Sequence, residues 1–140
     1  MQTWHLAQLN VARAIAALDS PELAEFVSAL ASVNALADGA PGFVWRFAGP
    51  DAGAPAATAA TDPRLLLNLS VWQSAEALFD FVYKTAHTAV MVKRRQWFEK
   101  PAQAHMVLWW VPAGHQPSLG EGLERLERLR REGPTAAAFT

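Results

Sequence analysis

One group of side chains in this chain could bind and activate a small molecule. Imidazole moves a proton near neutral pH or ligates iron, and a guanidinium binds a carboxylate through paired hydrogen bonds. If His87 begins a helix, then Met91 and Arg94 share its face by helical spacing, and Arg95 lies just beside them. We therefore predict a pocket with His87 as its reactive group and Met91, Arg94 and Arg95 as ligand-binding residues. The alternative is that His87 caps the helix and the arginines are solvated.

Tryptophan is the second residue type that could line this pocket. Residues 105–111 alternate as a strand does, so Trp109 and Trp110 point to opposite faces. One of them should be core and the other could line a cavity, and we assign Trp110 to the ligand. Trp45 lies in another alternating segment, 43–47, and is assigned to the ligand as well.

Composition and motifs exclude several other functions. With 12 Lys and Arg against 13 Asp and Glu, the net charge of −1 gives no field for nucleic acid or anionic lipid. The absence of cysteine removes thiol chemistry and fits a cytoplasmic protein, and the N-terminus does not resemble a signal peptide. The longest uncharged stretch, 101–120, contains prolines and glycines, so no membrane-spanning helix is expected. Hydrolase, nucleotide-loop and metal-ligand motifs are missing.

The elements that must position these residues follow the order βαββαβ, with an additional C-terminal helix. We expect strands at 1–11, 43–47, 65–72 and 105–111, and a loop at 49–63. We expect helices from Pro21 to a left-handed stop at Gly39, from Ser74 to about 84, at 87–98, and at 118–132 before an extended tail. In strand 65–72, Asn68 and Ser70 share a face with Trp72.

This order predicts one α+β domain spanning residues 1–140, of the ferredoxin-like type, with a four-stranded antiparallel sheet and helices on one face. The other face would remain open. Six tryptophans and seven phenylalanines present more aromatic surface than one helical layer hides. We therefore expect a homodimer in which a second subunit packs on the open face. The alternative is that helix 118–132 covers this face by itself.

Several short segments carry a family resemblance: Val71-Trp-Gln-Ser74, Tyr83-Lys-Thr-Ala-His87, Arg94-Arg-Gln-Trp-Phe98, Trp109-Trp-Val-Pro-Ala-Gly-His115 and Gly133-Pro-Thr135. In these the chain resembles a bacterial family known only as a domain of unknown function, within the dimeric α+β barrel superfamily. The resemblance implies the fold and the dimer. Its superfamily relatives include cofactor-free antibiotic-biosynthesis monooxygenases, haem-degrading monooxygenases, chlorite dismutases and muconolactone isomerases, so the fold does not select a reaction.

A narrower similarity concerns the haem-degrading relatives. They use an asparagine on the first strand, a tryptophan in a Val-Trp-x-Ser turn and an axial histidine beyond the next helix. The resemblance assigns these roles to Asn10, Trp72 and His87, which would be the iron ligand if haem is bound. Trp72 and His87 are closer in this sequence than in those relatives by about one helical turn, roughly 5 Å along the axis.

The leading hypothesis is a homodimeric protein that binds a small hydrophobic or aromatic molecule and oxygenates it without a cofactor. An aromatic or polyketide-like substrate would be deprotonated by His87, stacked on Trp72 and Trp110, and anchored by Arg95. One alternative is a haem protein or haem-dependent monooxygenase with His87 as the axial ligand. The other alternative is a non-catalytic binding or interaction module whose aromatic side chains are simply core.

Overall fold

The computed structural model describes residues 3–17, 20–47, 57–59, 62–84, 97–100 and 103–140. In chain order, the elements among them are β1 (Trp4–Arg13), the 3-10 turn η1 (Pro21–Leu23), α1 (Ala24–Asp38), β2 (Phe43–Arg46), β3 (Ala57–Ala59), β4 (Asp62–Trp72), α2 (Ala75–Lys84), β5 (Met106–Pro112) and α5 (Leu119–Glu132). The expected helical segment 87–98 lies mostly outside the described residues. No helix in the described part of the chain is long and apolar enough to cross a membrane.

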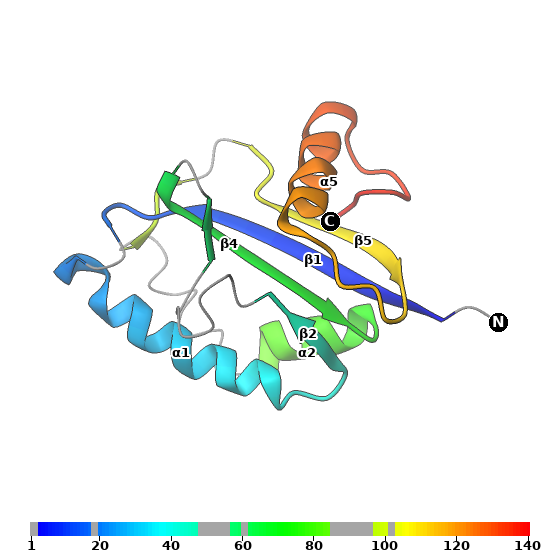
Figure 1. Ribbon diagram of the computed structural model, residues 1–140, viewed down its shortest axis with the longest axis horizontal. Helices are drawn as coiled ribbons and strands as arrows, with labels where there is room; N and C mark the ends of the chain where they lie inside the picture. Colours follow the sequence, from blue (N-terminus) through cyan, green and yellow to red (C-terminus); the bar gives the residue numbers. More distant parts are fainter. Residues whose placement is uncertain (1–2, 18–19, 48–56, 60–61, 85–96, 101–102) are drawn as a thin grey trace.

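The strands form one antiparallel sheet, as the order of elements predicts. The neighbours run β2-β4-β1-β5, and the long strands β4 and β1 lie at its centre (Figure 1). The short strand β3 also pairs with β4. It lies in the segment that was expected to be a loop, so that expectation was wrong for 57–59. Backbone pairing needs no large side chain, and the Ala-Thr-Ala segment therefore leaves little apolar signal.

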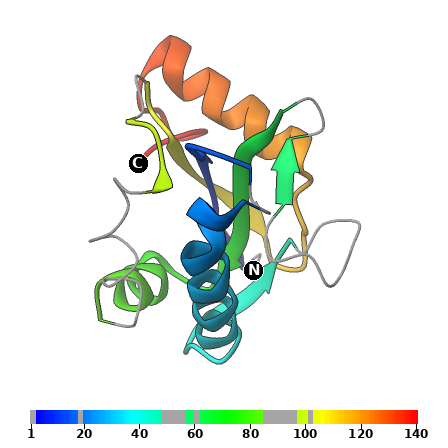
Figure 2. The ribbon, with the colours of Figure 1, turned by 90° about the vertical axis from the view of Figure 1, so that its left-hand side faces the viewer.

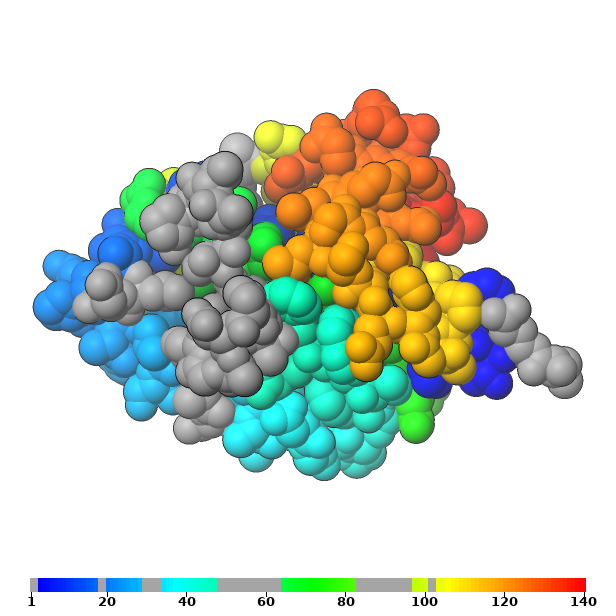
Figure 3. Space-filling model, in the orientation of Figure 1, coloured from blue at the N-terminus to red at the C-terminus, as the bar shows by residue number. Residues whose placement is uncertain are grey.

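Helices cover both faces of the sheet (Figure 2). α1 and α2 pack on one face, here called the helix-covered face, where Ala37, Leu78 and Phe81 meet Leu6 and Trp72. α5 packs on the opposite face through Leu126 and Leu129. The C-terminal helix therefore covers at least part of the face that was expected to be open. Figure 3 shows α5 and the chain that follows it as one continuous part of the surface.

The connection between α1 and β2 differs in detail from the sequence expectation. α1 ends at Asp38 as predicted, but Gly39 has a φ of −99° and is not left-handed. The positive φ of 82° belongs to Gly42, and a Cβ there would collide with Ala77 of α2. Glycine at this position therefore lets β2 and α2 approach closely. The backbone N–H of Gln73 donates to the Gly42 carbonyl at 2.7 Å and secures this corner.

Candidate functional site

A row of polar side chains crosses the helix-covered face. Gln8 lies opposite Ser70, and Asn10 lies opposite Asn68, across the β1–β4 pair. Directly opposed residues of antiparallel strands share a face, so all four side chains point the same way. Gln8 and Ser70 are only 6% and 7% exposed, whereas Asn10 is half-buried and Asn68 is exposed. The row therefore leads from the protein interior to its surface.

Hydrogen bonds join Gln8, Asn68, Ser70 and Trp72 into what we call the amide network. Gln8 Nε2 donates to Asn68 Oδ1 at 2.6 Å and to Ser70 Oγ at 2.7 Å. Trp72 Nε1 donates to the same Ser70 oxygen at 2.9 Å. A hydroxyl oxygen has two lone pairs, so these two bonds leave Ser70 only its proton to share. Among the described residues none accepts that proton, which makes Ser70 a potential donor to a guest molecule.

Aromatic side chains enclose the amide network on both sides. Trp72 is 2% exposed and stacks on Phe81, with 5.4 Å between ring centroids and Phe43 against its edge. Beyond the other end of the network lies a second aromatic cluster, formed by Phe26, Trp97 and Phe98. These apolar surroundings strengthen the two buried hydrogen bonds that Ser70 accepts from Gln8 and Trp72. The network itself contains no titratable group, so it can orient a polar atom but cannot take a proton.

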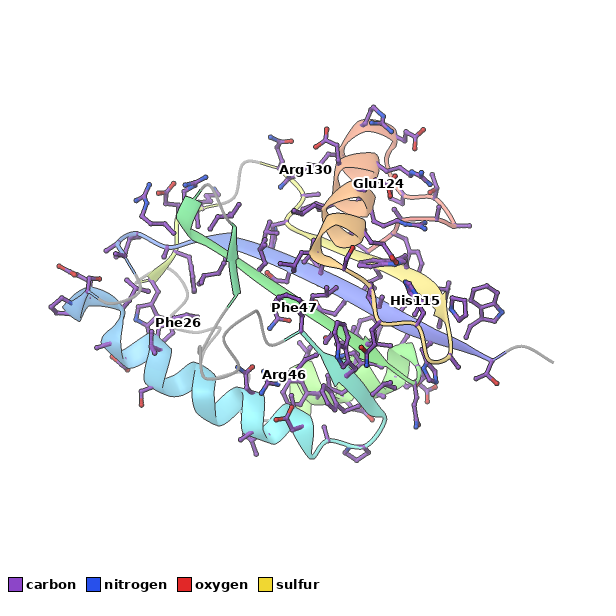
Figure 4. The ribbon with its side chains drawn as sticks, in the orientation of Figure 1. Phe26, Arg46, Phe47, His115, Glu124 and Arg130 are labelled. Atoms are coloured by element: carbon purple, nitrogen blue, oxygen red, sulfur yellow. The ribbon has the colours of Figure 1, made fainter. Side chains whose placement is uncertain are left out.

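A charged pair borders the network on the β2 side. Arg46 lies opposite Ser70 in the β2–β4 register and therefore points to the same face. Its Nε donates to Asp38 Oδ1 at 2.8 Å and its terminal nitrogen to Oδ2 at 3.3 Å, across the space between β2 and α1 (Figure 4). This two-pronged pairing closes the end of α1 onto the edge strand. Sequence analysis did not identify Arg46 because its position depends on the β2–β4 register.

The structure brings two of the predicted site residues onto one face. Asn10 and Trp72 both point toward α1 and α2, with Gln8 and Ser70 in the row between them. Trp72 has its stacking face on Phe81 and its N–H on Ser70, so it holds the network rather than presenting a free ring. The remaining predicted residues on the helical segment lie outside the described residues: His87, Met91, Arg94 and Arg95.

The other two predicted tryptophans occupy different places. Trp110 shares the helix-covered face with Leu6 and Trp72 in the register, but lies near the β5 edge and is 44% exposed. Trp109 is 1% exposed, which resolves the alternative that alternation left open: Trp109 is core and Trp110 is accessible. Trp45 lies opposite Val71 and packs on the α5 side of the sheet. The structure therefore does not bring Trp45 together with the amide network.

A second polar cluster, here called the carboxylate cluster, lies on the α5 side. Trp109 Nε1 donates to Glu121 Oε2 at 2.9 Å, and His115 Nε2 lies 2.8 Å from Oε1 of the same carboxylate (Figure 4). Burial is the largest single influence and raises the pKa of the Glu121 carboxyl, while the hydrogen bonds from His115 and Trp109 lower it. The charges of His115 and Arg125 act in the same direction, so the pKa of Glu121 lies below its ordinary value of 4.5.

Gln8, Ser70 and Glu121 are further polar residues that sequence analysis did not assign to a site. Side chains alternate along a strand, so Gln8 lies on the face of Asn10 and Ser70 on the face of Trp72. This shared face was the only signal in the sequence that could have placed Gln8 and Ser70 at the site. Acids and bases alternate along α5 at the spacing of i,i+4 pairs, so Glu121 gave no separate signal. In the structure only the Glu124–Arg128 part of that pattern forms an i,i+4 pair, at 2.9 Å, while Glu121 turns toward the sheet. Among the described residues no cluster suited to a metal ion is found.

A family comparison identifies the chain. The family described as a domain of unknown function (DUF3291) matches residues 5–140, which is nearly the whole sequence. The chain belongs to the DUF3291 family. The predicted membership in a family of unknown function is thereby confirmed. A search of curated proteins found no match for this DUF3291 protein.

Solved structures share the fold of this DUF3291 protein at low sequence identity. SnoaB, a cofactor-independent oxygenase from Streptomyces nogalater, is 16% identical with a TM-score of 0.52, covering 84% of this chain and 98% of its own. A protein of unknown function from Nitrosomonas europaea is 17% identical with a TM-score of 0.54, covering 83% and 97%. A conserved protein from Methanosarcina mazei Go1 is 11% identical with a TM-score of 0.54, covering 78% and 92%. The ferredoxin-like α+β prediction is confirmed.

Proposed function

We propose that this DUF3291 protein binds a small planar aromatic molecule on its helix-covered face and oxygenates it without a cofactor. The observation that carries the proposal is the Ser70 hydroxyl, whose two lone pairs are occupied by Gln8 and Trp72 and whose proton is left for a guest. A buried donor within an aromatic surrounding suits a ring that carries a carbonyl or phenolic oxygen. The shared fold with SnoaB makes oxygenation the reaction class to test.

The described residues would orient the substrate. Ser70 donates to the substrate oxygen, and the amides of Asn10 and Asn68 lie at the open end of the same row. Trp72 acts through Ser70 as a positioning residue. Because the amide network has no titratable group, proton removal from the substrate is assigned to His87, as the sequence predicts.

The proposed chemistry uses the substrate as its own reductant. An acidic methylene beside the ring loses a proton to His87, and the carbanion transfers electrons to dioxygen. One oxygen atom becomes a carbonyl on that carbon and the other leaves as water with both methylene hydrogens, so CH2 and O2 become C=O and H2O. The protein orients the substrate and accepts its proton. It also donates a hydrogen bond to the substrate oxygen, which becomes more negative when the carbanion forms.

The test uses anthrone, a flat tricyclic ketone with one activated methylene. We expect the purified protein to accelerate oxygen uptake and formation of the quinone, and Asn10→Ala to reduce that rate by about a hundredfold, the usual cost of removing one catalytic hydrogen-bond donor. Gln73→Ala, which removes an exposed amide just after β4, is the matched control and should retain the rate. No acceleration over buffer, together with no binding of anthrone, would refute the proposal.

The haem alternative is tested in the same experiment series. None of the histidines that the structure describes belongs to the amide network, so a haem on this face would depend on His87. A haem titration followed by visible absorbance distinguishes the two proposals. A saturable Soret shift that His87→Ala abolishes favours the haem protein over the cofactor-free oxygenase, and no ligand of either kind favours a non-catalytic module.

We propose further that the protein is a homodimer. On the α5 side of the sheet, Trp45, Phe47 and Leu65 remain only partly buried although they pack against the core. α5 reaches the sheet mainly at β1 and β5, which leaves these side chains on the β2–β4 half for a partner. Light scattering should give twice the chain mass of 15.2 kDa. A monomer at micromolar concentration would contradict this.

A further inference from the structure

A hollow of about 510 Å³ opens at the outer edge of β5, away from the amide network. It is lined by Trp4, Trp110, Arg125, Ala136 and Ala137. Trp4 and Trp110 are 50% and 44% exposed, which is unusual for the largest apolar side chain. Its volume lies within the range of small-molecule sites, roughly 300–1,000 Å³.

The hollow exists because the C-terminal segment leaves the sheet after a single pairing. Leu108 and Phe139 exchange two backbone hydrogen bonds, of 2.7 and 2.9 Å, across the outer edge of β5. The ladder would next join Trp110 to Ala137. Instead the Ala137 N–H donates to Thr135 Oγ1 at 3.2 Å, within a tight turn. The backbone of Trp110 therefore faces the hollow at a position that no described tail residue bridges.

Arg125 supplies a fixed cation to this hollow. One terminal nitrogen donates to the Ala137 carbonyl at 2.9 Å, which holds the side chain in place. Its Nε is buried and forms no hydrogen bond to any described group. Glu124 approaches Nε only to 3.6 Å, and its carboxylate is held more closely by Arg128, at 2.9 Å. Arg125 is thus a held cation whose nearest carboxylate is beyond hydrogen-bond distance.

The carboxylate of Glu121, the other acid near Arg125, is already engaged. Both of its oxygens are taken by Trp109 and His115 in the carboxylate cluster. The hollow therefore offers two accessible indoles and a guanidinium that lacks a closely bonded anion. These groups are complementary to a flat ring with a negative group at its edge. Indoles contact a ring over their faces, and the guanidinium fork matches the two oxygens of a carboxylate.

We infer that the hollow at Trp4, Trp110 and Arg125 is a second small-molecule site that takes a planar aromatic carboxylate. The ring lies against the two indoles, and the carboxylate meets Arg125. This site lies at the outer edge of β5, separate from the one proposed at the amide network, and its ligand differs in carrying a full negative charge.

Titration calorimetry with 2-naphthoate, and with 2-naphthamide as its uncharged counterpart, tests the inference on the full chain. We expect saturable binding of 2-naphthoate, and binding of the amide weaker by about tenfold or more, the usual value of a charge-assisted pair. Arg125→Gln should bring the affinity for the acid down to that for the amide. Arg131→Gln, on the exposed surface of the same helix, is the matched control and should bind as wild type.

Trp4→Ala tests the aromatic wall without disturbing the core, because Trp4 is half-exposed at the start of β1. We expect it to weaken both ligands alike, while Leu123→Ala, an exposed apolar side chain on α5, changes neither. Equal affinity for acid and amide overturns the assignment of a carboxylate. Loss of binding in Asn10→Ala but not in Trp4→Ala places the ligand at the amide network and overturns the second site. A dimer that Trp4→Ala dissociates, with no binding of 2-naphthoate, makes the hollow a subunit contact and also overturns it.

Discussion

Two polar clusters lie on opposite faces of the same sheet, and each holds a buried tryptophan by its indole N–H. In the amide network the acceptor is the Ser70 hydroxyl, and every member is uncharged. In the carboxylate cluster the acceptor is Glu121, an ionised group that also meets His115. A buried indole N–H is therefore satisfied by neutral groups in one cluster and by a charged carboxylate in the other.

This difference in charge indicates that one cluster suits ligand binding and the other stabilises the fold. Neutral donors can transfer a hydrogen bond to a guest without leaving a bare charge behind. The Glu121 carboxylate is only partly buried but is ionised and bonds two partners, so losing either of them costs more than losing a bond between neutral groups. The amide network is therefore suited to a ligand, whereas the carboxylate cluster fastens the start of α5 to the sheet, where Ser118 Oγ also accepts from the Glu121 N–H at 3.1 Å.

Removing the shared acceptor of the amide network has the largest expected effect. Ser70→Ala leaves Trp72 Nε1 and one hydrogen of Gln8 buried without a partner, at a cost of about 2–3 kcal/mol in the free energy of unfolding. Urea denaturation with an unchanged m-value measures it. Asn68→Ala removes an exposed acceptor, and Gln8 keeps its bond to Ser70, so this control should cost about 1 kcal/mol or less. Equal costs for the two variants would show that Ser70 does not hold the network.

Glu121→Ala comes next, with an expected loss of about 1–2 kcal/mol, because Trp109 Nε1 then lacks its acceptor in the core. The loss is smaller than for Ser70→Ala because the Glu121 side chain is 25% exposed, and water can partly replace its carboxylate. Glu127→Ala, exposed on the same helix, should change stability by less than about 0.5 kcal/mol and serves as the control in the same denaturation series. Equal losses of unfolding free energy for Glu121→Ala and Glu127→Ala would show that the carboxylate cluster does not stabilise the fold.

The two clusters should respond differently to acid. The folded-state pKa of Glu121 lies below its ordinary value of 4.5, so its stabilisation is complete above that pH and is lost as the pH falls through the folded value. We expect Glu121→Gln to flatten the decline in unfolding free energy as the pH falls below 4.5. Ser70→Ala should retain the wild-type slope because the amide network has no titratable group. A flattened slope in Ser70→Ala would contradict the comparison.

The smallest expected effect is the coupling between the clusters. They share no hydrogen-bond partner and lie on opposite sides of the sheet. The stability losses of Ser70→Ala and Glu121→Ala should therefore add to within about 0.5 kcal/mol in the double variant. A larger coupling energy, measured by the same urea series, would mean that the sheet transmits strain between its faces.

Much of the fold could be predicted from local patterns. Strand patterns in the sequence identified β1, β2, β4 and β5, and the helix expected at 118–132 is α5, which runs from Leu119 to Glu132. The stop of α1 was placed correctly, although its left-handed glycine was not, because the positive φ at Gly42 depends on contact with α2. β3 was missed because edge pairing with β4 depends on a distant strand rather than on its own side chains.

The candidate site was predicted only in part. Asn10 and Trp72 came from resemblance, and the structure places both on the helix-covered face. Gln8 and Ser70, which connect them, carry no motif, because a glutamine and a serine gain meaning only when the register sets them opposite each other. His87, Met91, Arg94 and Arg95 stay predictions.

The sequence by itself determined the α+β class, the order of the elements and which side chains of each strand share a face. These features follow from periodicities of two and 3.6 residues. It left open which face of each strand meets which helix. Only the tertiary structure decided that Trp109 is core while Trp110 lines a hollow, that α5 lies opposite α1 and α2, and that Glu121 bonds across to the sheet. These choices depend on contacts between residues far apart in the chain, and such contacts leave no periodic signal in the sequence.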